Sequence, residues 1–276
     1  MGGMKYLIVT ADDLGLARSV NDGIVQACRE GIVTAVSVIP TGEAFPDALK
    51  KIKELPFKDT GAHLSLSETK PIRPTTKFCK DHNEFFLNFL LGRMTLNNIY
   101  LELKAQMEVL RKSGLKITHI NSHGHIHMLP RILSIFIRIA KDYNVQAIRF
   151  PRLDRPVGRM AIREKYRKTA LDHFTPELKR VLRNSPLKYT DNFFGLLDAG
   201  RLNIDRIKGI LKMSGPGVTE LVTHPGFLGP EVLERYPWHI GGETELFALT
   251  DKRIKNAVAA NGIKLITYEE FIALRK

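Results

Sequence analysis

Short apolar runs alternate with longer amphipathic stretches along almost the whole of this 276-residue chain. Such an order of elements is typical of parallel strands that are joined by crossover helices. The predicted strands lie at residues 6–10, 35–39, 61–66, 118–121, 147–150, 192–196, 220–223 and 264–267. Their number is the one that a TIM-type barrel requires, so we expect an α/β fold with a TIM-like (β/α) barrel.

Capping residues predict where the connecting helices begin and end. Ser19 is a candidate N-cap for a helix that stops at Gly31, and Pro130 suits the first turn of another helix. Thr244 is a candidate cap for a last long helix that ends near Gly262. These residues predict helices between the predicted strands, as the alternating pattern requires.

The chain carries no internal repeat, low-complexity tract or linker rich in Pro, Ser or Gly. Its 43% hydrophobic and 26% charged residues are ordinary for a globular protein. We therefore expect one domain over residues 1–276, in which two longer insertions, at about 67–95 and 151–190, form loops on the barrel.

Cysteine use and the first residues predict the cellular compartment. Cys28 and Cys79 cannot form a disulfide framework, and they suit a reducing environment. The apolar run at residues 6–10 is too short for a secretory signal or a membrane span. We therefore expect a cytoplasmic protein.

The chain is strongly basic, with 42 Lys and Arg against 29 Asp and Glu, which gives a formal net charge of +13. Residues 149–188 alone hold twelve basic and four acidic side chains. No nucleic-acid motif accompanies this charge, so a solvated basic face is the favoured interpretation and no nucleic-acid partner is expected. Peripheral contact of residues 149–188 with an anionic membrane surface remains open.

Nearly every unusual polar residue falls where a predicted strand ends. In a parallel barrel these ends meet at one face, where active sites are built. We therefore expect side chains from distant parts of the sequence to converge there. The residues concerned are Asp12, Asp13, His63, Asn121, His123, His125, His127, Arg152 and His224.

Asp12 and Asp13 are adjacent, and neighbouring side chains in a strand point in different directions. One carboxylate could thus face a metal ion while the other faces a bound water. Taken alone, Asp-Asp-Leu-Gly is also good turn or helix-cap chemistry, and for the isolated pair that interpretation is favoured. The pair becomes informative together with the histidines.

Four of the nine histidines alternate with other residues between His119 and His127, and an extended chain would place them along one side. This clustering favours a divalent-ion site. Catalytic zinc sites take three protein ligands and leave a position for water, so the expected set is His123, His63 and one aspartate. His119 and His127 are expected to be hydrogen-bonded core residues.

His224 follows the predicted strand at residues 220–223 and precedes Pro225 and Gly226, which could fix its loop. A lone histidine in a turn is most simply a loop residue. Its place on the same face as the histidine cluster instead favours a group that donates a proton to a leaving amine.

Five segments of the chain, in their order and spacing, resemble the YdjC-type carbohydrate deacetylases. They are ADDLGLARSVNDGI, GAHLSL, THINSHGHIHMLP, IRFPR and LVTHPGF, and the resemblance extends over residues 4–270. That family includes chitooligosaccharide deacetylases, and one branch is associated with hopanoid lipid biosynthesis. The resemblance implies a metal-dependent hydrolase that removes an N-acetyl group from an amino sugar, within an oligosaccharide or linked to a lipid. Homodimers, as found in the family, are a further implication.

The resemblance also implies roles for single residues on an irregular (β/α) barrel. Asp13, His63 and His123 would hold one divalent ion, either Mg²⁺ or Zn²⁺. Asp12 would act as the general base. The residues expected to contact the substrate are Arg152 and His125.

Two positions depart from the family pattern. Asn121 stands where many chitooligosaccharide-active relatives have aspartate, and we expect this neutral neighbour to leave His123 less basic than a carboxylate would. Leu153 stands where the family has glutamate, with Asp154 one place later, which leaves the substrate contacts near Arg152 open.

Two other functions fit parts of the pattern. A metal-dependent phosphoesterase also uses clustered histidines on a barrel, but its usual two-ion version needs more acidic residues than lie near this cluster. A non-catalytic scaffold would bind an anionic surface through residues 149–188. Acetate release, measured beside a salt-sensitive binding assay, separates these functions.

Overall fold

A single curled sheet of parallel strands forms the centre of the molecule in a computed structural model, which describes residues 3–57, 59–151, 157 and 162–274. Every strand predicted from the sequence is present, with ends that differ by a few residues. The strands are β1 (Lys5–Leu14), β2 (Ala35–Val38), β3 (Thr60–Leu64), β4 (Ile117–Ser122), β5 (Ala147–Ile148), β6 (Asn192–Phe194), β7 (Gly217–Thr223) and β8 (Ile263–Leu265). The predicted α/β class is therefore confirmed.

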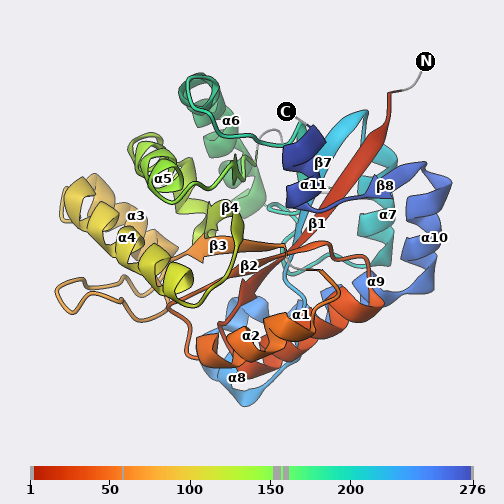
Figure 1. Cartoon of the computed structure of the whole chain (residues 1–276), viewed down its shortest axis with the longest axis horizontal. Coiled ribbons are helices and arrows are strands. Elements are labelled where there is room, and N and C mark those ends of the chain that lie inside the picture. The colour runs from red at the N-terminus through yellow and green to blue at the C-terminus, as the bar shows by residue number, and fades with distance from the viewer. Residues whose placement is uncertain (1–2, 58, 152–156, 158–161, 275–276) are drawn as a thin grey trace.

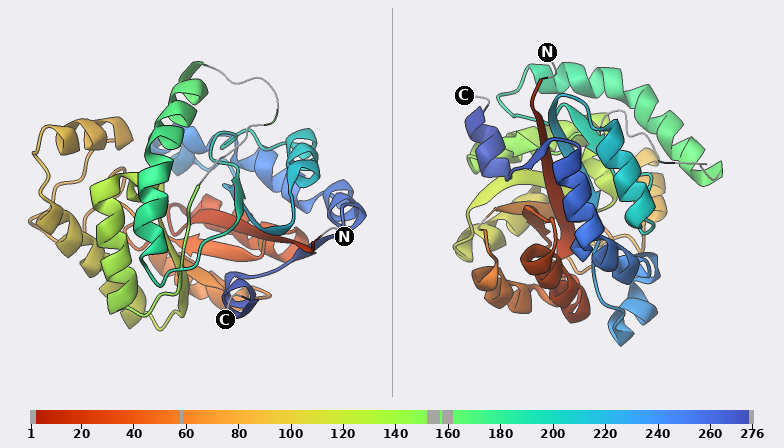
Figure 2. Two further views of the ribbon diagram at one scale, coloured as in Figure 1. Left: turned by 90° about the horizontal axis from the view of Figure 1, so that it is seen from above. Right: turned by 90° about the vertical axis from the view of Figure 1, so that its right-hand side faces the viewer.

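Helices surround this sheet (Figure 1). The helices are α1 (Arg18–Glu30), α2 (Phe45–Lys51), α3 (His82–Leu90), α4 (Leu96–Lys112), α5 (Pro130–Asp142), α6 (Ile162–Arg183), α7 (Ile204–Met213), α8 (Pro230–Arg235), α9 (Gly242–Thr250), α10 (Lys252–Ala260) and α11 (Tyr268–Leu274). Figure 2 shows α5 and α6 together on one side of the strands and α7 and α10 together on another. None of the helices in the described parts of the chain combines the length and apolar character that crossing a membrane requires.

The strand order shows how far the sheet closes. It runs β5-β4-β3-β2-β1-β7-β6, and every pair is parallel. One edge of β1 pairs with β7, while the other edge pairs with β8 near the start of β1 and with β2 near its end. Within the described residues, β5 and β6 do not pair with each other, so the expected barrel is a single-domain half-barrel.

Alternation along β1 separates the two faces of the sheet. Leu7 and Val9 are buried in the main apolar cluster with the helices, whereas Ile8 packs in a smaller cluster with α11. Thr10 and Asp12 continue the face of Ile8 and form hydrogen bonds to buried charged side chains. The concave face is therefore apolar where the strands begin and polar toward their carboxyl ends.

The sequence signals for helix ends are only partly borne out. The end of the first helix at Gly31 and the start of α5 at Pro130 are confirmed. The N-cap prediction for Ser19 is wrong, because α1 already begins one residue earlier. The Ser19 hydroxyl instead donates a hydrogen bond to the side chain of Glu231, 212 positions away in sequence.

Longer segments also contain more structure than the sequence pattern indicates. The last long helix is two helices, because Asp251 ends α9 and its side chain caps α10, while Thr244 lies inside α9. The insertions at 67–95 and 151–190 are not loops throughout, since they contain α3 and α6 respectively. The insertion at 67–95 also supplies part of the site described next.

Candidate active site

A bulge at the end of β1 brings two neighbouring carboxylates into one site. Between Ala11 and Leu14, β1 holds one residue more than the paired stretch of β2. Asp13 lies in this bulge with a left-handed backbone, at a φ of 68°. Bulges redirect side chains at the rims of barrels. Asp12 and Asp13 therefore both reach the same histidine, although regular alternation would send them in different directions.

That histidine is His63, on β3. Its Nε2 lies 3.3 Å from Asp13 Oδ1, and its Nδ1 lies 3.8 Å from Asp12 Oδ2. All three side chains are almost completely buried. One imidazole ring thus connects the two acids, using a different nitrogen for each.

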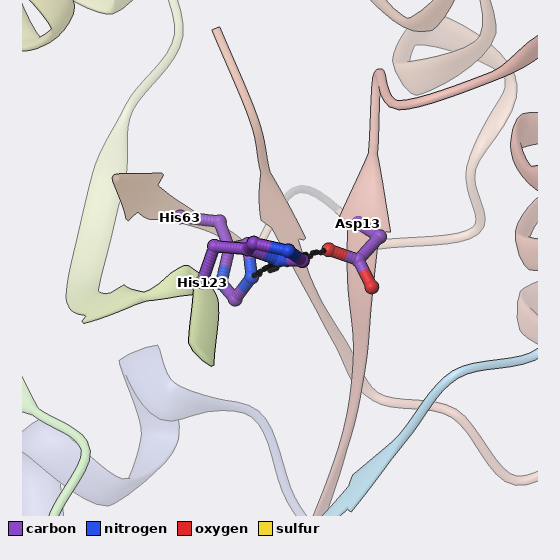
Figure 3. Close-up of side chains that lie close together, drawn as sticks. All are labelled: Asp13, His63 and His123. Atoms are coloured by element: carbon purple, nitrogen blue, oxygen red, sulfur yellow. Dashed lines mark hydrogen bonds and ion pairs between the residues drawn. The ribbon is translucent and has the colours of Figure 1, made fainter. Parts of the chain in front are cut away.

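His123, directly after β4, completes a cluster of three donor atoms (Figure 3). Its Nδ1 lies 3.0 Å from Asp13 Oδ1 and 3.3 Å from His63 Nε2. Ligands bound at about 2.0–2.1 Å to one ion lie about 2.8–3.4 Å apart, as tetrahedral or octahedral angles require. In addition, Asp13 Oδ2 is buried and has no hydrogen-bond partner among the described residues. The carboxylate and the two imidazoles therefore fit a divalent ion.

The second nitrogen of the His123 ring faces a carboxylate that the sequence patterns did not single out. Glu68 Oε2 lies 2.5 Å from His123 Nε2. Burial lowers the pKa of His123, but the carboxylates of Asp13 and Glu68 outweigh burial and raise the pKa to about 10. The ion-free ring is thus a protonated imidazolium between two carboxylates, and an ion that binds at Nδ1 displaces a proton.

Asn121, on β4, lies beside His63 and not beside His123. Its side-chain oxygen is 2.6 Å from His63 Nδ1, and its nitrogen donates to Ser37 Oγ at 2.8 Å. The predicted effect of Asn121 on His123 is therefore wrong, because the register of β3 and β4 pairs it with His63. With the amide turned over, its oxygen would instead accept hydrogen bonds from Arg149. The single amide oxygen cannot face both neighbours.

Arg149, directly after β5, is fully buried and forms hydrogen bonds with two buried acidic side chains. Its two terminal nitrogens donate to the two oxygens of Asp12, and its Nε donates to Glu220 Oε1 at 2.8 Å. Burial alone would raise the pKa of Asp12, but this guanidinium holds that pKa well below its usual value. Asp12 is therefore ionised at neutral pH and fixed through both of its oxygens.

A pocket of ≈ 720 Å³ adjoins the cluster. Of the further histidines that line it, three have at least one buried ring nitrogen without a hydrogen-bond partner among the described residues. These three are His125, His224 and His239. The loop of His224 is held in place, because its backbone N–H donates to Glu245 Oε2 at 2.6 Å. The free ring nitrogens can thus form hydrogen bonds with a ligand in the pocket.

The predicted site residues converge at one end of the half-barrel. The pocket lining includes Asp12, His63, His123, His125 and His224, and Asp13 joins this group through the cluster. Arg152 lies outside the described residues, as do Leu153 and Asp154.

Two histidines of the sequence cluster have the structural role expected of them. His119 is buried and contacts the hydroxyls of Ser37 and Thr118. His127 is buried between Ser122 and the backbone oxygen of Arg149. Their rings are therefore part of the core.

Three site residues were missed from the sequence. Arg149 carried a usable signal, since a charge inside the apolar run AIRFP must be neutralised when the strand is buried. Glu68 lies in an insertion expected to be a loop, and His239 stands in a segment with no motif. No local pattern distinguishes these two residues from surface positions.

Comparisons with known proteins identify the family of this chain. The family model described as YdjC-like protein matches residues 6–260. A carbohydrate deacetylase of Brevibacillus brevis is 32% identical, over 96% of this chain and 98% of its own length. A carbohydrate deacetylase of Mus musculus is 30% identical, over 98% of this chain and 96% of its own length. A chitooligosaccharide deacetylase of Escherichia fergusonii is 28% identical, over 96% of this chain and 98% of its own length.

A solved structure supports the fold. The crystal structure of an Enterococcus faecalis protein named for cellobiose-phosphate cleavage matches this one with a TM-score of 0.78. The match covers 98% of this chain and 99% of that chain at 23% identity, a level that concerns the fold alone. The family model, by contrast, spans most of the sequence, including the bulge on β1 and the cluster of donor atoms. The chain therefore belongs to the YdjC-like protein family.

Proposed function

We propose that this protein is a metal-dependent hydrolase that removes the N-acetyl group from an amino sugar. The observation that carries the proposal is the triangle of Asp13, His63 and His123 beside the ionised Asp12, in the wall of a pocket. The names of the carbohydrate deacetylase and chitooligosaccharide deacetylase relatives support the substrate class. Acetate and the free amino sugar are the products of such a reaction.

One divalent ion, Mg²⁺ or Zn²⁺, would be held by Asp13, His63 and His123. When bound, such an ion polarises the acetamide carbonyl and lowers the pKa of a coordinated water. Two imidazoles favour Zn²⁺, whereas a carboxylate-containing site with open positions also accepts Mg²⁺. The fold already holds the three donor atoms at the spacing that ligands of one ion require.

Asp12 is the proposed general base. Its two contacts with Arg149 keep the carboxylate ionised and fix its direction beside His63. A carboxylate with a lowered pKa is a weak base, so its effect depends on its position relative to the attacking water.

His224 is the proposed proton donor to the departing nitrogen. Its ring lines the same pocket as Asp12, and Nδ1 has no hydrogen-bond partner among the described residues. The hydrogen bond from its backbone N–H to the Glu245 side chain fixes the position of the loop. A proton donor is needed because an unprotonated amine is a very poor leaving group.

The finer features of the proposal come from the sequence and from the family. His125 and Arg152 would contact the substrate, an N-acetylated oligosaccharide or a lipid-linked glucosamine. The protein would act in the cytoplasm as a homodimer, and residues 149–188 would contact a membrane surface if the substrate is lipid-linked.

Two neighbouring substitutions test the proposal. Asp12→Asn cannot accept a proton, so it should keep its metal while acetate release falls by about 10²–10⁴-fold. Asp13→Asn should lose or weaken the ion, because an open three-ligand site has no spare ligand. Bound metal by mass spectrometry and acetate release from N-acetylglucosamine compounds are measured on both variants and on the wild type.

The outcomes are distinct. Near wild-type turnover in Asp12→Asn would contradict the role of this residue as the base. Exchanged phenotypes would mean that Asp12 faces the ion and Asp13 the water. Absence of acetate release by metal-loaded wild-type protein from every N-acetylated sugar tested would contradict the function itself.

A further inference from the structure

We propose that Glu68 is a positioning residue, which holds the imidazole of His123 so that Nδ1 faces the divalent ion. The inference rests on the metal site of the proposed function. It adds a residue from outside the five motifs, in the insertion at 67–95.

The distance between His123 and Glu68 distinguishes two roles for this carboxylate. Glu68, His82 and His123 lie close enough together to be considered as a second cation site. Two neighbouring ligands of one ion, however, lie about 2.8–3.4 Å apart, and no two ligands lie closer than that. His123 Nε2 and Glu68 Oε2 are only 2.5 Å apart, and His82 Nδ1 is 4.0 Å from the same oxygen. The short contact fits a charge-assisted hydrogen bond in which the ring N–H donates to the carboxylate.

This hydrogen bond determines which nitrogen of the ring can bind an ion. With an ion bound, the ring would be a neutral imidazole that carries one proton, so a ring that donates from Nε2 has its lone pair on Nδ1. Nδ1 is the atom that lies 3.0 Å from Asp13 and 3.3 Å from His63. Metal-binding histidines commonly donate their second N–H to a carboxylate, which fixes the ring and increases its basicity as a ligand.

The backbone of the insertion places this carboxylate. Glu68 has a left-handed φ of 64°, which residues with a side chain adopt rarely and which persists where the surroundings hold it. Its N–H donates to Cys79 O at 3.1 Å, and the N–H of Cys79 donates back to Leu66 O at 3.3 Å. The Glu68 side chain is only 10% exposed. The insertion therefore folds back on the end of β3 and delivers one buried acid to His123.

The test is a calorimetric titration of metal-free protein with Zn²⁺, without any substrate. Glu68→Ala should raise the Kd by about 10–100-fold, the range found when such outer partners are removed. Glu68→Gln should lose less, because its amide oxygen can still accept the ring N–H. The matched control is Glu84→Gln in the same insertion. The Glu84 carboxylate accepts a hydrogen bond from the backbone N–H of Lys80 and not from His123. This control variant should bind Zn²⁺ like the wild type.

A second measurement separates positioning from direct ligation and from misfolding. Co²⁺ replaces Zn²⁺ at saturating concentration, and its visible spectrum reports the ligand set. Glu68→Gln should give the wild-type spectrum, since the three ligands are unchanged. Circular dichroism and the melting temperature of the metal-free variants check the fold.

Three results would overturn the inference. They are an unchanged Kd in Glu68→Ala, a Kd in Glu84→Gln that rises as much as in Glu68→Ala, and a changed Co²⁺ spectrum in Glu68→Gln, which would make Glu68 a ligand. A wild type that binds no divalent ion would refute this inference together with the metal site. If the wild type binds the ion, Glu68→Ala binds it more weakly, and the wild type releases no acetate, the proposed function alone would be refuted.

Discussion

Replacement of Arg149 by methionine should destabilise the protein far more than the loss of a surface ion pair. Arg149 is 1% exposed and donates to Asp12 and Glu220, which are 1% and 0% exposed. Methionine keeps an unbranched apolar chain but leaves two buried carboxylates without a counter-ion. Breaking a buried pair costs about 3–5 kcal/mol, and native domains are stable by about 5–15 kcal/mol. The variant should therefore lose between about one fifth and all of its stability.

The pH dependence should show that Asp12 has lost its partner. In the wild type the pKa of Asp12 lies below its usual 3.8, so its contribution to stability is complete above that pH and is lost as the pH falls further. In Arg149→Met, burial without a neighbouring cation should raise the pKa of Asp12 above its usual value. Relative to the wild type, the free energy of unfolding of the variant should then increase as the pH falls through that raised pKa toward 3.8, the usual pKa of aspartate in the unfolded chain.

Urea unfolding at several pH values, followed by circular dichroism, measures both effects. The matched control is Arg235→Met, which breaks an ion pair with Glu43 whose side chains are 49% and 45% exposed. This control should cost far less than Arg149→Met, because an exposed ion pair adds little to stability. Arg149→Met combined with Asp12→Asn and Glu220→Gln should recover stability, because no buried charge remains. If Arg149→Met costs no more than Arg235→Met, the buried ion network does not stabilise the fold as described.

Two further predictions follow from the site. Burial lowers the pKa of His127 to about 3 and that of His239 to about 4, below the usual 6.5, so stability should fall as the pH drops below 6.5. Each ring contributes up to about 1.4 kcal/mol to this loss of stability per pH unit. The control His173→Gln, at an exposed position, should leave the slope of stability against pH unchanged. A flat profile in urea unfolding would contradict the prediction. Asn121→Asp should lower the Kd for Zn²⁺ by about tenfold, because a carboxylate can accept hydrogen bonds from both of its neighbours at once. Calorimetry that shows unchanged or weaker binding would refute the importance of the contact with His63.

Most of the strands could be predicted from the sequence because they contain short apolar runs, which local composition reveals. Closure of the sheet could not be predicted, because it depends on long-range pairing between strands at its two edges. The error at Thr244 has a local cause, since both it and Asp251 are good capping residues and the sequence does not show which of them starts a helix. The error at Ser19 arose because its hydroxyl found a partner distant in sequence.

The candidate site also combines features that the sequence predicts with features that depend on long-range contacts. The convergence of Asp13, His63 and His123 could be predicted because each lies at or directly after the end of a strand, where a parallel fold gathers its side chains. Only the resemblance to the YdjC-type family distinguished Asp13 from Asp12 as the expected ligand. The contact of Arg149 with Asp12 could not be predicted, because 137 positions separate them and only the folded sheet brings them together. Asn121 was paired with the wrong histidine because strand register, which decides its neighbour, is not visible in one segment alone.

The left-handed backbone at three site residues has a consequence for protein engineering. Asp13, Glu68 and His125 have φ values of 68°, 64° and 54°, and among the described non-glycine residues only Asn144 shares this conformation. Glycine would relieve backbone strain of about 1–2 kcal/mol at each position. A library selected for heat resistance alone would therefore enrich glycine where a carboxylate or an imidazole is needed. Selection for thermal tolerance should keep these three codons fixed, or count retained metal as a second criterion.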